Sequence, residues 1–269
     1  MNKLQEKILE IMVFIDKICR ENDITYYIMG GTALGAVRHG GFIPWDDDLD
    51  IWLTPENYEK FKKLFEENTY EKFVLQEWKL VDEYLQYAKV RMNGTTFIES
   101  HLKNKKDLHQ GIYVDIMILH KTPAGKKGVL NRQYYVSKYL TLKGILRNGW
   151  KGKNTTQKIL AGIAKMLPKC LDKKLYKYIY KYDNLQDNYN YIYYITKGTK
   201  KSGYYERSII EPAGEIEFEG KTFLCMNDIK KYLELRYGDY MALPPKSEQK
   251  SVQHAEIWDT EKHFSEYLE

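Results

Sequence analysis

Apolar residues recur every three or four positions over residues 3–21, the spacing of an amphipathic α-helix. The charged residues scattered among them distinguish this segment from a secretory signal peptide. We therefore expect a helix that buries one face: Leu4, Ile8, Ile11, Met12, Ile15, Ile18 and Cys19.

The next segment predicts a strand, a turn, a helix and a second strand. A short β-rich run, ITYYIMGG, ends in Gly30 and Gly31, and a helix is expected over 32–39. Residues 48–53 predict the second strand. Thr54 followed by proline is typical of a helix N-cap with proline at the first helical position. The helix that follows should bury Tyr58, Phe61, Leu64 and Phe65.

Later patterns complete an α+β chain. Strands are predicted over 73–78, 84–92 and 111–119, a basic helical stretch over 129–182 with a break at Pro168, a hairpin turning at Glu219-Gly220, and a last helix over 227–237. We expect a mixed β-sheet flanked by helices, with a mainly helical basic lobe. The predicted division is a core over 1–120, the lobe over 121–189 and a C-terminal segment, 190–269, that completes the core.

Composition narrows the class of protein. A chain of 269 residues with 43% hydrophobic and 29% charged residues is long enough for a full core and is neither disordered nor collagen-like. No apolar run approaches the length of a membrane span. Three cysteines far apart in sequence favour a reducing compartment. We therefore expect a cytoplasmic protein.

Charge is concentrated in the middle of the chain. The net charge is +5, yet residues 121–183 hold 16 Lys and Arg against two acids, which leaves the remainder negative. Such a segment suits an anionic partner such as a lipid surface. Within it, residues 157–181 combine an apolar stripe with lysines and tyrosines, a pattern typical of peripheral contact with an anionic membrane. A solvated, lysine-rich helical surface is the alternative.

Three acids carry the predicted chemistry. Asp48 and Asp50 straddle one residue of a predicted strand, so period-two geometry points both carboxylates to the same face. Asp115 lies in an otherwise apolar strand, where an unpaired carboxylate is costly. Close carboxylates repel unless a cation lies between them, and hard oxygen ligands suit Mg²⁺ (or Mn²⁺). Two glycines before a helix favour phosphate binding at its positive end, so Gly30 and Gly31 are candidate phosphate contacts.

Several cationic residues are candidates for substrate binding. Arg38 could pair with a phosphate or with Asp46 or Asp47. Lys89 shares a strand face with Arg91, and two cations side by side suit a diphosphate. The roles of Asp46 and Asp47 stay open. Other candidate substrate contacts are Arg91, His39 and His254, whereas His101, His109, His120 and His263 are expected to be surface residues.

The segment GTALGAVRHGGFIPWDDDLDI closely resembles the signature of the LicD family, which belongs to the nucleotidyltransferase superfamily and is related to fukutin. Weaker similarity continues in YAKVRMNGTTF, GIYVDIMIL and YGDYMALPP, the last followed by His254. The resemblance therefore covers most of the chain and implies a nucleotidyltransferase-like core.

The resemblance also implies a reaction. Members of this family move a phospho-alcohol, typically phosphocholine from CDP-choline, onto a sugar hydroxyl of a cell-surface glycan or teichoic acid precursor and release CMP. Here Asp48 and Asp50 would hold Mg²⁺ at the donor diphosphate, and Asp115 would be a further ligand or the base. Thr32 would line the donor phosphates together with the two glycines. The acceptor is expected to be lipid-linked, and no nucleic acid is expected as a partner.

The sequence does not determine which alcohol head group is transferred. Ethanolamine, glycerol or ribitol phosphate donors would need the same metal site, and a nucleotidyltransferase that releases pyrophosphate would share it. A membrane-surface module without enzymatic activity is the third alternative. A choline cage would need aromatic faces, for which the candidates near the site are Trp45, Trp52, Tyr26, Tyr27 and Tyr113.

Overall fold

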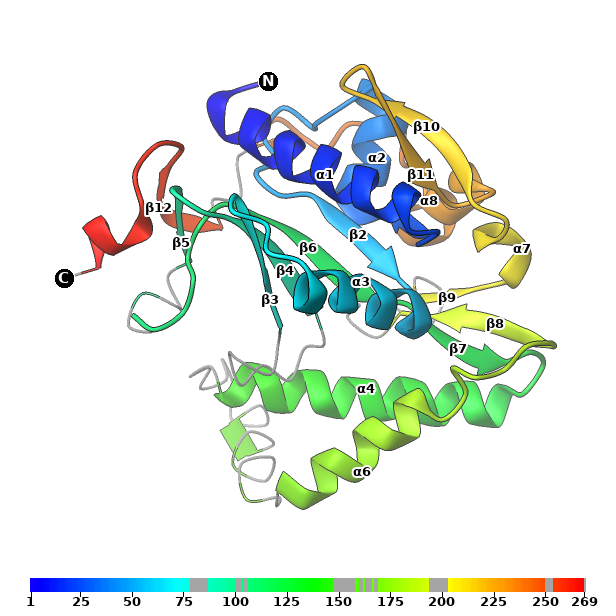
Figure 1. Cartoon of the computed structure of the whole chain (residues 1–269). Helices are drawn as coiled ribbons and strands as arrows, with labels where there is room; N and C mark the ends of the chain where they lie inside the picture. The colour runs from blue at the N-terminus through cyan, green and yellow to red at the C-terminus, as the bar shows by residue number, and fades with distance from the viewer. Residues whose placement is uncertain are drawn as a thin grey trace. The chain divides into compact units, whose positions relative to one another are not determined.

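A computed structural model describes residues 1–77, 87–99, 103, 106–147, 158, 159, 162, 166, 169–193, 203–249 and 254–268 (Figure 1). The chain forms two compact units. The first comprises Met1–Val81, Tyr87–Ile118 and Ser208–Glu269, and the second comprises Asp82–Gln86 and Leu119–Arg207. The candidate site residues all belong to the first unit.

A five-stranded mixed sheet is the centre of the first unit. Its order is β1 (Tyr26–Ile28), β2 (Asp50–Leu53), β6 (Tyr113–Ile118), β4 (Tyr87–Met92) and β3 (Phe73–Gln76). Only β2 and β6 run parallel, and the other pairs are antiparallel. The expected α+β class with a mixed sheet is confirmed.

Helices cover this sheet where the apolar stripes predict them. Helix α1 (Lys3–Glu21) packs against β4 and β6 with its predicted apolar face buried, and an Asn2–Gln5 capping box fixes its start. Helix α3 (Pro55–Glu67) begins where expected, because Thr54 Oγ1 accepts a hydrogen bond from the Asn57 amide. Helix α2 (Gly30–His39) contacts β2, and it also contacts α8 (Ile229–Tyr237).

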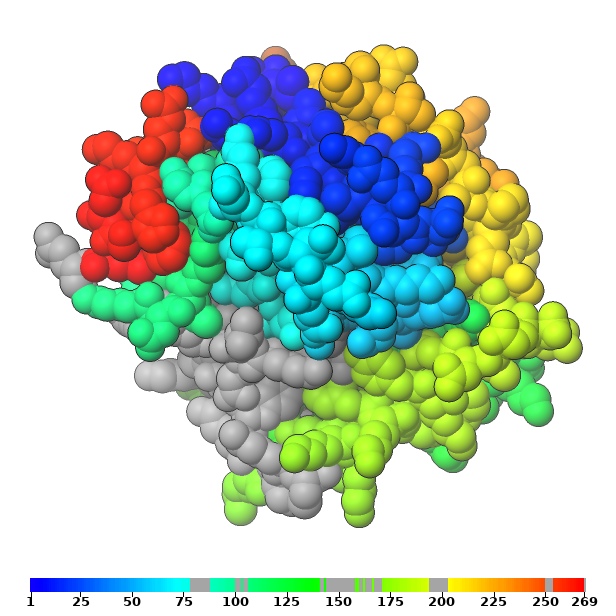
Figure 2. Space-filling model, in the orientation of Figure 1, coloured from blue at the N-terminus to red at the C-terminus, as the bar shows by residue number. Residues whose placement is uncertain are grey.

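The C-terminal part of the first unit adds two small sheets. Strands β10 (Gly214–Phe218) and β11 (Lys221–Cys225) form the predicted hairpin, which follows a short helix, α7 (Arg207–Ile210). Strand β12 (Ala255–Asp259) pairs with β5 (Thr96–Glu99), so the end of the chain, red in Figure 2, lies beside residues about 160 positions earlier. A short 3₁₀ helix, Phe264–Tyr267, follows.

The second unit combines two helices with a three-stranded antiparallel sheet. Strands β7 (His120–Pro123), β8 (Tyr189–Ile192) and β9 (Tyr204–Tyr205) form the sheet, which the sequence patterns did not predict. Helices α4 (Lys127–Arg147) and α6 (Lys169–Tyr180) contact each other and β7. They pack around Leu140, Ile179 and Ile192.

Charged groups are buried inside this second unit. The Lys143 ammonium lies 2.7 Å from the Asp172 carboxylate. His120 was expected at the surface, but it is only 2% exposed because its Nδ1 bonds to Asp183 at 2.9 Å. Part of the segment 157–181, including the expected break at Pro168, lies outside the described residues. Within the part of the chain that the structure describes, no helix has both the length and the apolar character needed to cross a membrane.

Two element boundaries at the site differ from the prediction. Helix α2 starts at Gly30 rather than Thr32, because the Ala33 amide already bonds to the Met29 carbonyl. Strand β2 starts at Asp50 rather than Asp48. The chain before it turns, with the Asp46 amide bonded to the Ile43 carbonyl, so Asp48 lies in a loop at the entrance to the strand.

Candidate active site

Two glycines let carboxylates approach the start of helix α2. A Cβ atom at Gly31 would lie 2.7 Å from Asp46 Oδ2, and one at Gly30 would lie 3.1 Å from Asp50 Oδ2. Gly30 also has φ +58°, a backbone conformation that favours glycine. The positive end of the helix therefore faces acidic side chains directly.

Hydrogen bonds from other segments fix this turn. The Gly30 amide donates to the Tyr232 hydroxyl at 2.8 Å, and the Asp50 amide donates to Thr32 Oγ1 at 2.9 Å. The Gly30 amide was predicted to contact phosphate, but in this structure its hydrogen bond goes to Tyr232. Thr32 is buried and holds the acid-bearing strand against α2.

Mutual repulsion and burial perturb the acids. Burial raises the pKa of Asp46 to about 8, and the charge of Asp48 adds to the shift. Burial also raises the pKa of Asp50 well above its usual range, with the charges of Asp48 and Asp115 contributing. The pKa of Asp48 is raised by burial, and the charge of His254 opposes the shift. A cation bound among these acids would stabilise their ionised forms.

Sheet register brings Asp115 to this cluster. Asp115 on β6 is opposite Asp50 on β2 and opposite Lys89 on β4. Lys89 Nζ lies 2.8 Å from Asp115 Oδ1. Burial raises the pKa of Asp115 to about 6, and the Lys89 charge opposes the shift. The three predicted acids therefore gather at one place, with a cation already beside one of them.

Buried side chains surround Lys89 and hold its ammonium in place. Its ammonium lies 3.3 Å from the centre of the Tyr113 ring and 3.7 Å from Glu99 Oε2. Arg91 has no exposed surface; its guanidinium bonds to Gln76 Oε1 at 2.6 Å and to the Gly111 carbonyl, and it also lies near Glu99. The structure therefore places Lys89 at the acid cluster and Arg91 farther from Asp115.

Asp47 binds the C-terminal segment. Its Oδ1 lies 2.6 Å from His254 Nδ1, and its Oδ2 accepts the His254 amide at 3.0 Å. His254 Nδ1 also lies 3.7 Å from Asp48 Oδ2. The hydrogen bond that His254 donates to Asp47 raises the pKa of His254 to about 9. The role of Asp47, which the sequence left open, is to hold His254 at the edge of the acid cluster.

Arg38 shapes a loop. Its Nη1 donates to the carbonyls of Tyr240 at 3.1 Å and Ala242 at 3.2 Å, instead of pairing with Asp46 or Asp47. His39 is exposed at the end of α2, with its ring 6.3 Å from that of Trp45.

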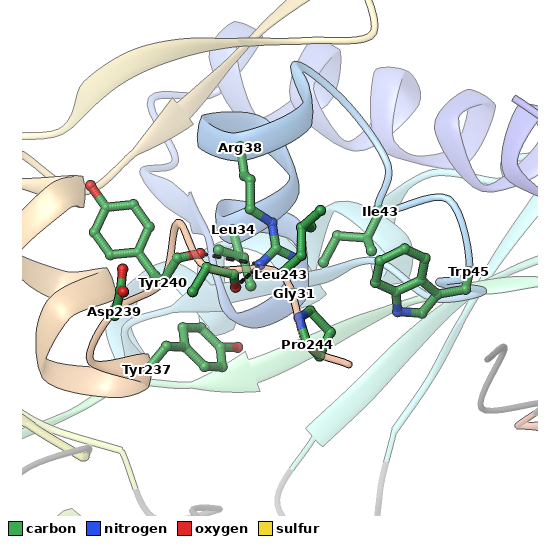
Figure 3. A pocket seen from close by; sticks show the side chains of 11 residues that line it. Gly31, Leu34, Arg38, Ile43, Trp45, Tyr237, Asp239, Tyr240, Leu243 and Pro244 are labelled. Atoms are coloured by element: carbon green, nitrogen blue, oxygen red, sulfur yellow. Dashed lines mark hydrogen bonds between the residues drawn. The ribbon is translucent and has the colours of Figure 1, made fainter. Parts of the chain in front are cut away.

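A cleft of about 500 Å³ opens beside Gly31 (Figure 3). Helix α2 and the chain around Trp45 form one wall, and the loop after α8 forms the other. Of the five aromatic residues named as cage candidates, only Trp45 lines the cleft. The other four are buried core residues: Tyr26, Tyr27, Trp52 and Tyr113. Tyr237 and Tyr240 contribute the remaining rings of the cleft.

The acids could bind a divalent cation whose remaining ligands are substrate oxygens. Asp50 Oδ1 is buried and has no hydrogen-bond partner among the described residues. Mg²⁺ is usually bound by one or two carboxylates together with waters and phosphate oxygens. Among the same residues, no three His, Cys, Asp or Glu side chains are placed to hold an ion by themselves. Asp48 and Asp50 are therefore a partial donor set that a diphosphate would complete.

The sequence patterns missed three contributors to the site. Tyr232 and Tyr237 belong to the last helix, and Glu99 ends strand β5, two residues after the motif YAKVRMNGTTF. That motif and the tail motif YGDYMALPP, which starts at Tyr237, were the available signals.

Comparison with known proteins agrees with the motifs. Residues 23–139 match the family model described as LicD/FKTN/FKRP, nucleotidyltransferase domain. The chain is 28% identical to the lipopolysaccharide cholinephosphotransferase LicD of Haemophilus influenzae over 246 residues, 90% of this chain and 91% of the relative. A shorter match, 44% identical over 55 residues, covers 20% of this chain and 18% of an uncharacterized protein of Rickettsia typhi. With the acid cluster of the signature segment assembled at the start of α2, these matches show that residues 23–139 carry a LicD-family domain and that the protein is a transferase enzyme of LicD type.

Proposed function

We propose that this protein transfers a phospho-alcohol, with phosphocholine from CDP-choline as the leading donor, to a sugar hydroxyl of a cell-surface glycan precursor and releases CMP. The name of the Haemophilus relative, a lipopolysaccharide cholinephosphotransferase, supports the transferred group and the class of acceptor. The observation that carries the proposal is the gathering of Asp48 and Asp115 around Asp50, whose carboxylate lies at the positive end of α2.

Phosphoryl transfer depends mainly on positioning and on neutralising charge. Mg²⁺ held by Asp48 and Asp50 would supply positive charge at the donor diphosphate. The start of α2 and the ammonium of Lys89 add fixed positive potential on the protein side. These groups favour the diphosphate over a neutral ligand.

The reaction exchanges one phosphorus–oxygen bond for another. The sugar oxygen bonds to the phosphorus of the phospho-alcohol, the bond to the CMP oxygen breaks, and CMP leaves. The hydroxyl proton must leave to a base. Asp115, with a pKa raised to about 6 by burial, is the candidate for this base or for a further metal ligand.

A product assay tests the proposal. The purified protein is incubated with CDP-choline, Mg²⁺ and a lipid-linked glycan acceptor, and CMP is quantified by chromatography while choline on the acceptor is measured by mass spectrometry. We expect both products with the native chain and neither with Asp50→Asn. No CMP from any CDP-alcohol would refute the proposal.

A nucleotidyltransferase is the second candidate, because the matched domain carries that description. It would release pyrophosphate from CTP and attach the nucleotide to the acceptor. Pyrophosphate without CMP release would favour this candidate, since the two reactions break different bonds of the donor.

A further inference from the structure

We infer that the cleft beside Gly31 binds a quaternary ammonium group, the head group of the phospho-alcohol that is transferred. The inference rests on the proposed function and adds the site at which the head group is held. It depends on the side chains that line the cleft and on where the cleft lies relative to the acids.

The walls of the cleft suit an alkylated cation. Three rings line it, from Trp45, Tyr237 and Tyr240 (Figure 3). Asp239 adds an exposed carboxylate between the two tyrosines in sequence. Aromatic faces and a nearby negative charge are what bind a quaternary ammonium, which can neither donate nor accept hydrogen bonds. The rest of the lining is largely apolar and suits the methyl groups: Leu34, Ile43, Ala242, Leu243 and Pro244.

The cleft adjoins the acid cluster at Gly31. Gly31 lies in its wall, and the Asp46 carboxylate packs against the same glycine. Trp45 directly precedes Asp46 in sequence. The Tyr237 hydroxyl is close enough to Asp46 and Asp50 for their charges to raise its pKa, in addition to the effect of burial. A phosphate at the acids and an ammonium in the cleft would need only a short link, as in phosphocholine.

The polar groups of the lining argue against other occupants. Arg38 is the cation of the cleft, but its Nη1 is bound to the Tyr240 and Ala242 carbonyls and holds the wall in place. A nucleobase or a sugar needs several directional hydrogen-bond partners when it is desolvated. A neutral polyol such as glycerol or ribitol would not use the negative charge of Asp239, which is exposed to solvent. The charge and the ring faces together favour the ammonium.

Donor kinetics test the inference. The variants are Trp45→Leu, Tyr240→Leu and Asp239→Asn, and the control is Trp258→Leu, which removes a 43% exposed tryptophan on β12 outside the cleft. We expect kcat/KM for CDP-choline to fall about 5- to 30-fold in the ring variants, the effect of losing one cation–π contact. CMP inhibition should change by less than about twofold, and the control should match the native chain. An equal loss of CMP affinity, or unchanged kcat/KM for CDP-choline, would overturn the inference.

A binding measurement tests the ammonium site independently of turnover. Saturation-transfer NMR reports contact between the protein and the N-methyl protons of phosphocholine. We expect a signal with the native chain and Trp258→Leu and a weakened signal with Trp45→Leu and Tyr240→Leu, with thermal unfolding confirming that each variant is folded. If no CDP-alcohol releases CMP but this pattern is seen, the proposed function fails and the ammonium site stands. If CMP is released but the N-methyl signal is absent or unaffected by the ring variants, the ammonium site is wrong.

Discussion

The Asp47–His254 pair predicts a pH-dependent difference in stability. His254→Gln keeps a side chain of similar length but removes the charge that pairs with Asp47. The native pKa of His254 is raised to about 9 from 6.5, chiefly by the hydrogen bond that its ring donates to Asp47. At 1.36 kcal/mol per pKa unit, the shift corresponds to at most about 3 kcal/mol. The His254 side chain is 38% exposed, so solvent screening reduces the expected contribution to about 1–2 kcal/mol.

The direction of the pH effect follows from the raised pKa. A group that binds its proton more tightly in the folded state contributes its full stability below the unfolded pKa, here 6.5. The contribution is lost as the pH rises through about 9. The native chain should therefore be more stable than His254→Gln at pH 6, and the two should converge near pH 10. The charge of His254 also partly offsets the rise that burial causes in the pKa of Asp46 and Asp48, and this effect has the same sign, because it too is present only while His254 is protonated.

Urea unfolding, followed by circular dichroism with a chelator present, measures the difference. The control is His263→Gln, an exposed histidine of the same segment whose ring bonds to Ser265 instead of a carboxylate. We expect this control to show no pH-dependent gap. A gap between the native chain and His254→Gln that is the same at pH 6 and pH 10, or that widens with pH, would refute the assigned ion pair.

Three further predictions concern activity and location. Asp48→Asn and Asp50→Asn should each abolish CMP release with the circular dichroism spectrum unchanged, because metal-assisted charge stabilisation of several kcal/mol is lost; near-native turnover with Mg²⁺ present would contradict the assignment. Asp115→Asn should lower kcat strongly with little change in the dissociation constant of the donor, as measured by calorimetry, whereas full activity would leave Asp115 with only a structural role. The basic segment 121–183 should bind vesicles containing anionic lipid at low salt and release them as salt rises; no co-sedimentation at low salt would favour a solvated surface.

The basic segment illustrates a limit of sequence patterns. Helix α6 exposes Lys173, Lys174 and Lys177, whereas Ile179 packs with Leu140 of α4. One face of this helix is therefore covered within its own unit, which agrees with the solvated-surface alternative for these residues. Periodicity identifies an apolar stripe but not what covers it, since a protein core and a lipid surface select the same residues.

Local elements of the first unit were predictable. The spacing of apolar residues predicted α1, Thr54 and the following proline predicted the start of α3, and Glu219-Gly220 predicted the hairpin. Each of these features depends on residues a few positions apart. The Asp-x-Asp pair and the family signature likewise lie within one short segment, so the acids could be named before their geometry was known.

The partners of those acids were decided by tertiary structure. Asp47 pairs with His254, and the Gly30 amide pairs with Tyr232, each more than 200 positions away. Lys89 meets Asp115 only because β4 and β6 pair in one particular register. A side chain's own sequence neighbourhood does not specify which distant segment it will meet, since that choice follows from how the whole sheet pairs and how the helices cover it. The sequence therefore determined which acids could bind a cation, and the packing of distant segments determined the position, the hydrogen-bond partners and the pKa of each.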